Sequence, residues 1–215
     1  MSSAFRAATP FGGTSTPALS LSWALLRHIA DAGSRKVTYA LARLEMMRVR
    51  RHPEAVIRAL RHARSVLIVC HGNIIRSAFA AQLLRETLGP SARVSFASAG
   101  LEATPGRSPH PLALLLGATL RVDLRAHRAT RLSEEHVRAS DVIFAVDVPQ
   151  LVATRQRFPD ARQKTFLLAS LAPWTPMEID DPVNGDEPVF EVCFTHILHA
   201  VRPIARVLSQ PHARQ

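Results

Sequence analysis

The chain has 215 residues, 47% of them hydrophobic, which is long enough to bury a full core in one domain or two. It contains no apolar run of membrane-spanning length, and its two cysteines, Cys70 and Cys193, are too few for a disulfide framework. These features exclude membrane-spanning and disulfide-rich classes, and we expect a reducing, cytoplasmic location.

Positive charge is concentrated in the N-terminal third of the chain. Residues 1–64 contain 11 basic and 3 acidic residues, a net charge of +8. Residues 65–215 contain 16 basic and 14 acidic residues, a net charge of +2. Because the larger part is nearly neutral, no nucleic-acid partner is expected.

The basic N-terminal third divides into a tail and a helical segment. Residues 1–19 are small, polar and interrupted by Pro and Gly, which predicts a disordered tail. Residues 20–64 are predicted to form a basic helical extension of two or three helices. The first would end at Gly33, and the last would begin at Pro53.

The middle helix of this extension is predicted over residues 36–51. Its apolar residues recur at helical spacing between arginines; they are Val37, Ala40, Leu41, Leu44 and Met47. Two interpretations stay open at this point. The extension either packs on the main domain, or forms a basic docking surface for an acidic protein or an anionic membrane surface.

From residue 65 onward, short apolar runs alternate with helical patterns. Strands are predicted at 66–70, 94–98, 142–146 and 165–168, and helices at 77–88, 110–118, 133–139, 149–157 and 188–208. This alternation predicts one α/β domain with a parallel sheet over residues 65–215. Ligands of such sheets bind at the carboxyl ends of strands, beside a switch in strand order.

The segment from Cys70 to Ser77, with the sequence CHGNIIRS, joins the first predicted strand to a helix. The N–H groups of a tight loop and of the following helix start can bind an oxyanion. Arg76 can hold two phosphate oxygens at once, and the same positive field favours Cys70 as a thiolate. Gly72 and Asn73 permit backbone conformations that other residues resist. The segment therefore predicts a phosphate site with a cysteine nucleophile.

Other kinds of site are not supported by the residue pattern. Cys193 lies inside the last predicted helix, where a packed core thiol is expected. The ten histidines form no spaced ligand cluster with Cys or carboxylates, so no metal and no other cofactor are expected. No nucleotide-triphosphate loop of the Gly-x-x-x-x-Gly-Lys type occurs.

The string Cys70–Ser77 resembles the signature loop of low-molecular-weight protein tyrosine phosphatases. The resemblance runs from about residue 65 to residue 207. It includes, in the order of the family, Ser98-Ala99-Gly100, Asp123-Leu124, His127-Arg128-Ala129, Asp147 and Asp180-Asp181-Pro182. It implies a four-stranded parallel sheet flanked by helices, to which this chain adds an N-terminal α-helical extension.

The resemblance also implies an activity, the hydrolysis of phosphotyrosine in proteins through a phosphocysteine intermediate. Cys70 would be the nucleophile, Arg76 would hold the phosphate, and Asp181 rather than Asp180 would be the general acid and base. The residues that would bind phosphate are His71, Gly72, Asn73, Ile74, Ile75, Arg76 and Ser77. The side chains that would hold the loop in shape are Asn73, Ser77, Ser98 and His127.

Three residues bear on the type of reaction. Ile75 stands where the family usually has a second cysteine, so a disulfide between neighbouring loop thiols is impossible. Val183 stands where an aromatic residue often lines the pocket mouth, and Ile74 matches tyrosine-type members rather than those that resemble phosphoarginine phosphatases. The alternatives are an arsenate-reductase-like thiol enzyme, for which relay thiols are lacking, and a catalytically weak phosphate-binding or scaffold protein that acts through its basic extension.

Overall fold

The computed structural model describes the backbone of residues 23–210 and the side chains of residues 33–210. By its internal contacts the chain divides into two units, residues 1–36 and 37–215. Of the first unit, only the helical residues 23–36 are described. The predicted disordered tail and the predicted helix start at residues 20–22 lie outside the described residues.

Helix α1 (Trp23–Arg51) is continuous over 29 residues, so the predicted break at Gly33 was wrong. A glycine ends a helix by taking a left-handed φ, which Gly33 does not do. A glycine inside a helix costs only about 1 kcal/mol relative to alanine. That cost is small beside the hydrogen bonds that a helix of this length maintains.

The remaining elements lie in the second unit. The helices are α2 (Glu54–His62), α3 (Arg76–Leu88), α4 (Pro111–Thr119), α5 (Glu134–Arg138), α6 (Val148–Arg157) and α7 (Glu187–Ser209), and the strands are β1 (Ser65–Cys70), β2 (Ser95–Gly100), β3 (Val142–Ala145) and β4 (Thr165–Leu167). Every strand and helix predicted after residue 52 is present, with small shifts at the ends. Among the described residues, no helix is long and apolar enough to cross a membrane.

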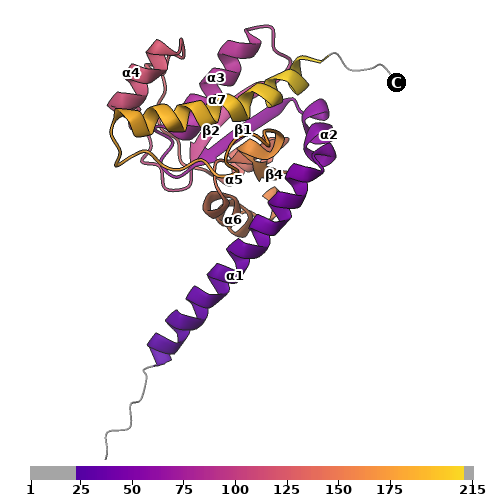
Figure 1. The fold of residues 1–215 in the computed structure, drawn as a ribbon, viewed down its shortest axis with the longest axis vertical. Coiled ribbons are helices and arrows are strands. Elements are labelled where there is room, and N and C mark those ends of the chain that lie inside the picture. The colour runs from indigo at the N-terminus through magenta and orange to yellow at the C-terminus, as the bar shows by residue number, and fades with distance from the viewer. Residues whose placement is uncertain (1–22, 211–215) are drawn as a thin grey trace, which may run out of the picture. The chain divides into compact units, whose positions relative to one another are not determined.

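The four strands form one parallel sheet in the order β2-β1-β3-β4, which confirms the predicted fold class. Strand β1 lies inside the sheet, with β2 on one side and β3 on the other. Figure 1 labels β1 beside β2. The chain therefore leaves β1 toward one edge and later returns to the opposite side. The carboxyl end of β1 is the switch point at which such sheets bind ligands.

Helices cover both faces of the sheet. Val66, Ile68 and Cys70 of β1 point to one face, in a core shared with α2, α3, α4 and α7. Leu67 and Val69 point to the other face, where they pack with Leu132, Val137 and other residues around α5. Because both faces are covered, the strand is apolar at every position rather than alternating, which is typical of a buried parallel strand.

Helix α1 contacts the α/β core through its residues 42–50. Ala42 and Met46 are buried against α6, β3 and β4. Glu45 forms an ion pair with Arg155 at 2.9 Å, and Arg50 donates to the carbonyls of Ala172 and Thr175. This part of the extension therefore packs on the main domain, as one of the two predicted interpretations required.

The residues that revealed the helical pattern are not the ones that make this contact. Val37, Leu41 and Leu44 are 59%, 62% and 55% exposed, although their spacing predicted an apolar side. The helix thus has two apolar sides, a narrow one formed by Ala42 and Met46 and a wider one that faces solvent. The sequence pattern indicates the wider side, because it has more large apolar residues. The contact with the α/β core is made by the narrower side, where Ala42 is small and buried.

Replacement of Met46 by alanine tests this contact. Because Met46 is 1% exposed, we expect Met46→Ala to lower the free energy of unfolding by about 2–5 kcal/mol. The matched control is Leu44→Ala on the same helix, for which a change within about 0.5 kcal/mol is expected. Chemical denaturation of the two full-length variants measures both values, and equal values would contradict the packing described.

Candidate active site

The loop between β1 and α3 forms a small pocket at the switch point of the sheet. The pocket has a volume of about 150 Å³. It is lined by Cys70, His71, Gly72, Asn73, Ile74, Ile75, Arg76, Glu102, Thr104, Arg107, Asp181 and Val183. The structure thus brings the predicted nucleophile, arginine and acid together from positions more than a hundred residues apart.

Asn73 holds the shape of this loop. Its φ is 54°, in the left-handed region that asparagine tolerates better than most residues. Its Nδ2 donates to the hydroxyls of Ser77 and Ser98, both at 2.9 Å, and its Oδ1 accepts from the N–H of Thr130 at 2.8 Å. The Nε2 of His127 lies 2.7 Å from the Asn73 carbonyl. The four side chains predicted to hold the loop therefore form one connected network.

The protonation of His127 fits its place in this network. Burial lowers the pKa of its imidazole, and the nearby guanidinium groups of Arg85 and Arg128 act in the same direction, against the hydrogen bond to Asn73. A neutral imidazole can still donate from Nε2 to the Asn73 carbonyl. The contact therefore persists without a positive charge on His127.

Asn73 is the residue of the loop whose backbone is in the left-handed region. The prediction that Gly72 takes such a conformation was wrong, because its φ lies outside that region. A Cβ placed on Gly72 would meet only Ile74 Cγ1, at 3.7 Å. The glycine without free space beside this loop is Gly100 at the end of β2, where a Cβ would lie 2.5 Å from the His71 carbonyl oxygen and 2.9 Å from the Asn73 nitrogen. The loop therefore rests against the bare backbone of β2.

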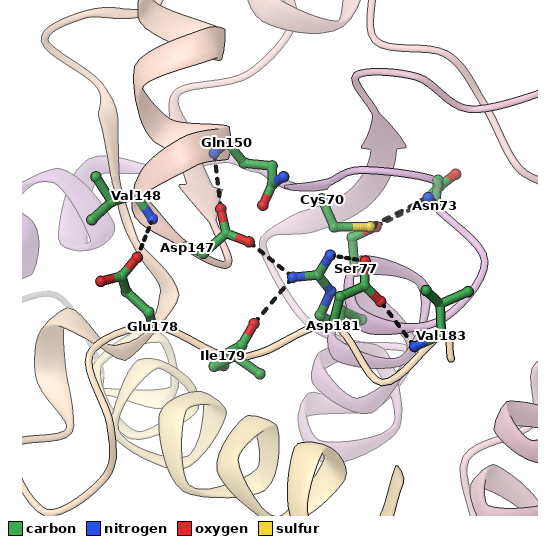
Figure 2. A network of polar contacts seen from close by, with 11 residues as sticks. Cys70, Asn73, Ser77, Asp147, Val148, Gln150, Glu178, Ile179, Asp181 and Val183 are labelled. Carbon is green, nitrogen blue, oxygen red and sulfur yellow. Dashed lines mark hydrogen bonds and ion pairs between the residues drawn. The ribbon is translucent and has the colours of Figure 1, made fainter. Parts of the chain in front are cut away.

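The sulfur of Cys70 lies beside two hydrogen-bond donors. The N–H of Asn73 donates to Sγ at 3.3 Å, and the Ser77 hydroxyl lies 2.9 Å from Sγ (Figure 2). Because Asn73 Nδ2 already donates to the Ser77 oxygen, the hydroxyl proton is free to point at the sulfur. Two donors directed at sulfur bind it best when it carries a negative charge.

The guanidinium of Arg76 is buried at the other end of the loop, with 2% of the residue exposed. Its Nη1 donates to Asp147 Oδ2 at 2.9 Å and to the Ile179 carbonyl at 3.0 Å, and its Nη2 forms an ion pair with Asp181 (Figure 2). Burial alone would lower the pKa of Arg76, but Cys70, Asp181 and Asp147 together raise it. Arg76 is therefore a fixed positive charge beside the cysteine sulfur.

Asp147 is the partner of Arg76 that sequence reasoning missed. It was noted only as part of the resemblance, without a role in the site. Its Oδ1 accepts from the N–H of Gln150 at 2.8 Å, and so caps α6. Burial raises the pKa of Asp147, opposed by the hydrogen bond from Gln150 and by Arg76. An acid directly after a buried strand of a parallel sheet was the available signal.

The two neighbouring acids before Pro182 have different surroundings. Asp181 lines the pocket of Cys70, and its Oδ1 accepts from the N–H of Val183 at 3.3 Å. Asp180 is exposed and lines only an adjacent cleft of about 640 Å³. Asp181 alone therefore shares a pocket with the cysteine.

Helix α1 reaches the rim of this site, which the sequence did not predict. Arg43 lines the cleft that contains Asp180, and its guanidinium lies 3.6 Å from the carboxylate of Glu178. Tyr39 and the loop residue His71 border a further cleft of about 530 Å³. The single tyrosine of the chain is thus close to the phosphate loop rather than remote from it.

Cys193 is a buried core thiol on α7, as predicted. Burial raises its pKa to about 12, so the thiol is protonated and poorly nucleophilic. Within residues 33–210, no group of three or more His, Cys, Asp or Glu side chains is arranged to hold a metal ion.

Residues 65–213 match the model of the family described as low molecular weight phosphotyrosine protein phosphatase. The chain belongs to this family. It is therefore a cysteine-dependent phosphatase of the protein-tyrosine-phosphatase type, and the predicted resemblance is confirmed. The match begins at the first residue of β1, so α1 and α2 lie outside it.

Individual relatives agree with the family match. Wzb from Salmonella typhi, a low molecular weight protein-tyrosine-phosphatase, is 31% identical over 145 residues, which are 67% of this chain and 93% of Wzb. The crystal structure of the tyrosine phosphatase AmsI from Erwinia amylovora has a TM-score of 0.63 at 30% identity and covers 69% of this chain and 95% of its own. The structure of the YwlE arginine phosphatase from Geobacillus stearothermophilus has a TM-score of 0.63 at 27% identity and covers 69% of this chain and 99% of its own.

The two glycines provide a matched test of the loop geometry. We expect Gly100→Ala to lower the free energy of unfolding by about 1–3 kcal/mol, because the new methyl group would overlap backbone atoms of the loop. Gly72→Ala has open space and a permitted φ, so its effect is expected to lie between no change and a gain of about 1 kcal/mol. Thermal unfolding of both variants compares them; a larger loss for Gly72→Ala would contradict the described loop.

Proposed function

We propose that the protein hydrolyses phosphotyrosine in proteins, with Cys70 as nucleophile, Arg76 as phosphate ligand and Asp181 as general acid and base. The observation that carries this proposal is the shared pocket of these three side chains at the switch point of the sheet. The nucleophile, the cation and the acid are the three groups that transfer of a phosphoryl group to sulfur requires.

In the first step the phosphate group enters the pocket and replaces Asp181 as the hydrogen-bond partner of Arg76 Nη2. Asp147 and the Ile179 carbonyl keep the guanidinium in place through Nη1. The backbone N–H groups of residues 71–77 bind the remaining oxygens. The Cys70 thiolate attacks phosphorus, and the bond from phosphorus to the phenolic oxygen breaks. Asp181, which takes up a proton from solvent once it has left Arg76, gives that proton to the phenolic oxygen.

In the second step the Asp181 carboxylate takes a proton from water, and the resulting nucleophile attacks the phosphocysteine. The bond from phosphorus to sulfur breaks, and Cys70 leaves as a thiolate. The Ser77 hydroxyl, 2.9 Å from Sγ, donates a hydrogen bond to the sulfur as its negative charge returns. The side chains of Asn73, Ser98 and His127 act as positioning groups, because their hydrogen bonds hold the loop in shape.

The choice of phosphotyrosine over other substrates rests on Ile74 and on the pocket mouth. Ile74 lines the pocket and matches tyrosine-type members of the family, whereas Val183 offers a poorer wall to an aromatic ring than the aromatic residue that often stands at its position. The likeness to the YwlE arginine phosphatase makes phosphoarginine the competing substrate. Arsenate reduction is disfavoured, because Ile75 supplies no thiol and the Cys193 thiol is buried with a raised pKa.

The remaining predictions concern the rest of the chain. We infer that residues 65–215 form the phosphatase domain and that residues 20–64 form a basic helical extension. A cytoplasmic location stays a prediction, as does a partner for the extension, either an acidic protein or a membrane surface. The exposed side of α1 bears on that partner.

The first experiment measures hydrolysis of p-nitrophenyl phosphate, a phosphotyrosine peptide and free phosphoarginine without added metal. We expect turnover of the first two substrates, and its loss in Cys70→Ser, because a hydroxyl is a far weaker nucleophile than a thiolate. Binding of inorganic phosphate to Cys70→Ser, measured by calorimetry, is expected to persist. Retained turnover would overturn the role of Cys70, and faster release of phosphate from phosphoarginine would overturn the substrate. Folded but inactive wild type would favour the phosphate-binding or scaffold alternative.

The choice between the two acids is tested by matched amide variants. Asp181→Asn is expected to slow formation of the phosphocysteine by about 10²–10⁴-fold, the usual contribution of a general acid. Asp180→Asn makes the same substitution at the neighbouring position and is expected to slow formation of the phosphocysteine far less. Single-turnover kinetics on the phosphotyrosine peptide compares the two, and a larger effect at Asp180 would show that the acid is misassigned.

A further inference from the structure

One side of α1 exposes large apolar side chains with no partner in the described part of the chain. Val37, Leu41 and Leu44 are 59%, 62% and 55% exposed, and Met47 is 42% exposed. These four residues, called here the α1 apolar face, recur every three or four positions and so lie along one side of the helix. Single exposed apolar residues are common on protein surfaces, but four in line over three turns form a patch.

The orientation of this patch is fixed by contacts on the other side of the helix. Met46 is buried against α6 and β4, Glu45 pairs with Arg155, and Arg50 donates to the carbonyls of Ala172 and Thr175. Rotation of the helix to bury Leu41 and Leu44 would break all of these contacts. The α1 apolar face is therefore held toward solvent.

The charge around the patch is positive. Arg48 and Arg51 are exposed beside Leu44 and Met47, and residues 37–64 contain seven arginines but only two acidic residues, a net charge of +5. One of those acids, Glu45, is paired with Arg155. The surface therefore combines apolar area with uncompensated positive charge.

We propose that the α1 apolar face, with Arg48 and Arg51, binds the surface of an anionic lipid bilayer. Basic helices with aliphatic residues on one side lie in the interface with the apolar side chains inserted and the arginines at the anionic headgroups. A second copy of the chain fits less well, because its own α1 apolar face carries the same excess of arginine and offers no complementary negative charge. The N-terminal residues 1–22 contain no acidic residue and thus offer no complementary charge either.

The test is flotation of the full-length protein with vesicles of phosphatidylcholine and phosphatidylglycerol at a 3:1 ratio, beside vesicles of phosphatidylcholine alone. We expect binding to the anionic vesicles, weakened by 0.5 M salt, and partitioning at least about tenfold weaker to the neutral ones. The double variant Leu41→Ser/Leu44→Ser is expected to partition at least about tenfold more weakly, because two inserting side chains are lost.

A matched control keeps the proposal falsifiable. Leu115 on α4 is 53% exposed, so Leu115→Ser removes a similarly exposed leucine elsewhere and is expected to leave binding unchanged.

Three results would overturn the proposal. They are absence of binding to the anionic vesicles, equal binding to both kinds of vesicle, and an equal loss in Leu115→Ser. Sedimentation of the free protein as a dimer that Leu41→Ser/Leu44→Ser dissociates would assign the face to a second copy instead.

Discussion

The buried positive charge of Arg76 is the constraint on which the rest of the site depends. A guanidinium with 3% of its side chain exposed must be paired, and removal of one partner of such a pair costs about 3–5 kcal/mol. Its partners come from the segment after β3, which supplies Asp147, and from the segment before α7, which supplies the Ile179 carbonyl and Asp181. One cation therefore positions the acid beside the cysteine, although Cys70 and Asp181 lie far apart in the sequence.

The parallel sheet makes this convergence possible. The ends of β1, β2 and β3 lie at the same edge, so the residues that follow them are neighbours in space. The same rule explains how Ser98 and Thr130 reach Asn73, and how Gly100 lies against the loop without a side chain between them. The strained left-handed residue is thus fixed from several segments at once, and the sulfur and the guanidinium keep their relative positions.

The features that could be predicted from the sequence depend on residues that are close together in the chain. The apolar run from Val66 to Val69 and the chain of glycine, asparagine and arginine after Cys70 identified the strand, the loop and the family, because these signals depend on near neighbours. The ion pair of Arg76 with Asp147 and the free space around Gly72 depend on segments remote in sequence, and no local pattern reports them. The predicted helix end at Gly33 was wrong for a related reason. A glycine ends a helix only where the chain turns into a left-handed conformation, and the chain does not turn at Gly33.

Helix α1 connects the extension to the chemistry through its different sides. Met46 anchors it, Arg43 and Tyr39 border the clefts beside the phosphate loop, and Leu41 and Leu44 point to solvent. Residues 37–51 are one uninterrupted helical segment, so these sides cannot move independently of one another. Whatever binds the outward side is consequently held at a fixed distance from the pocket of Cys70. Among the described residues of α1, Tyr39 and Arg43 border the neighbouring clefts and do not line the pocket of Cys70 itself.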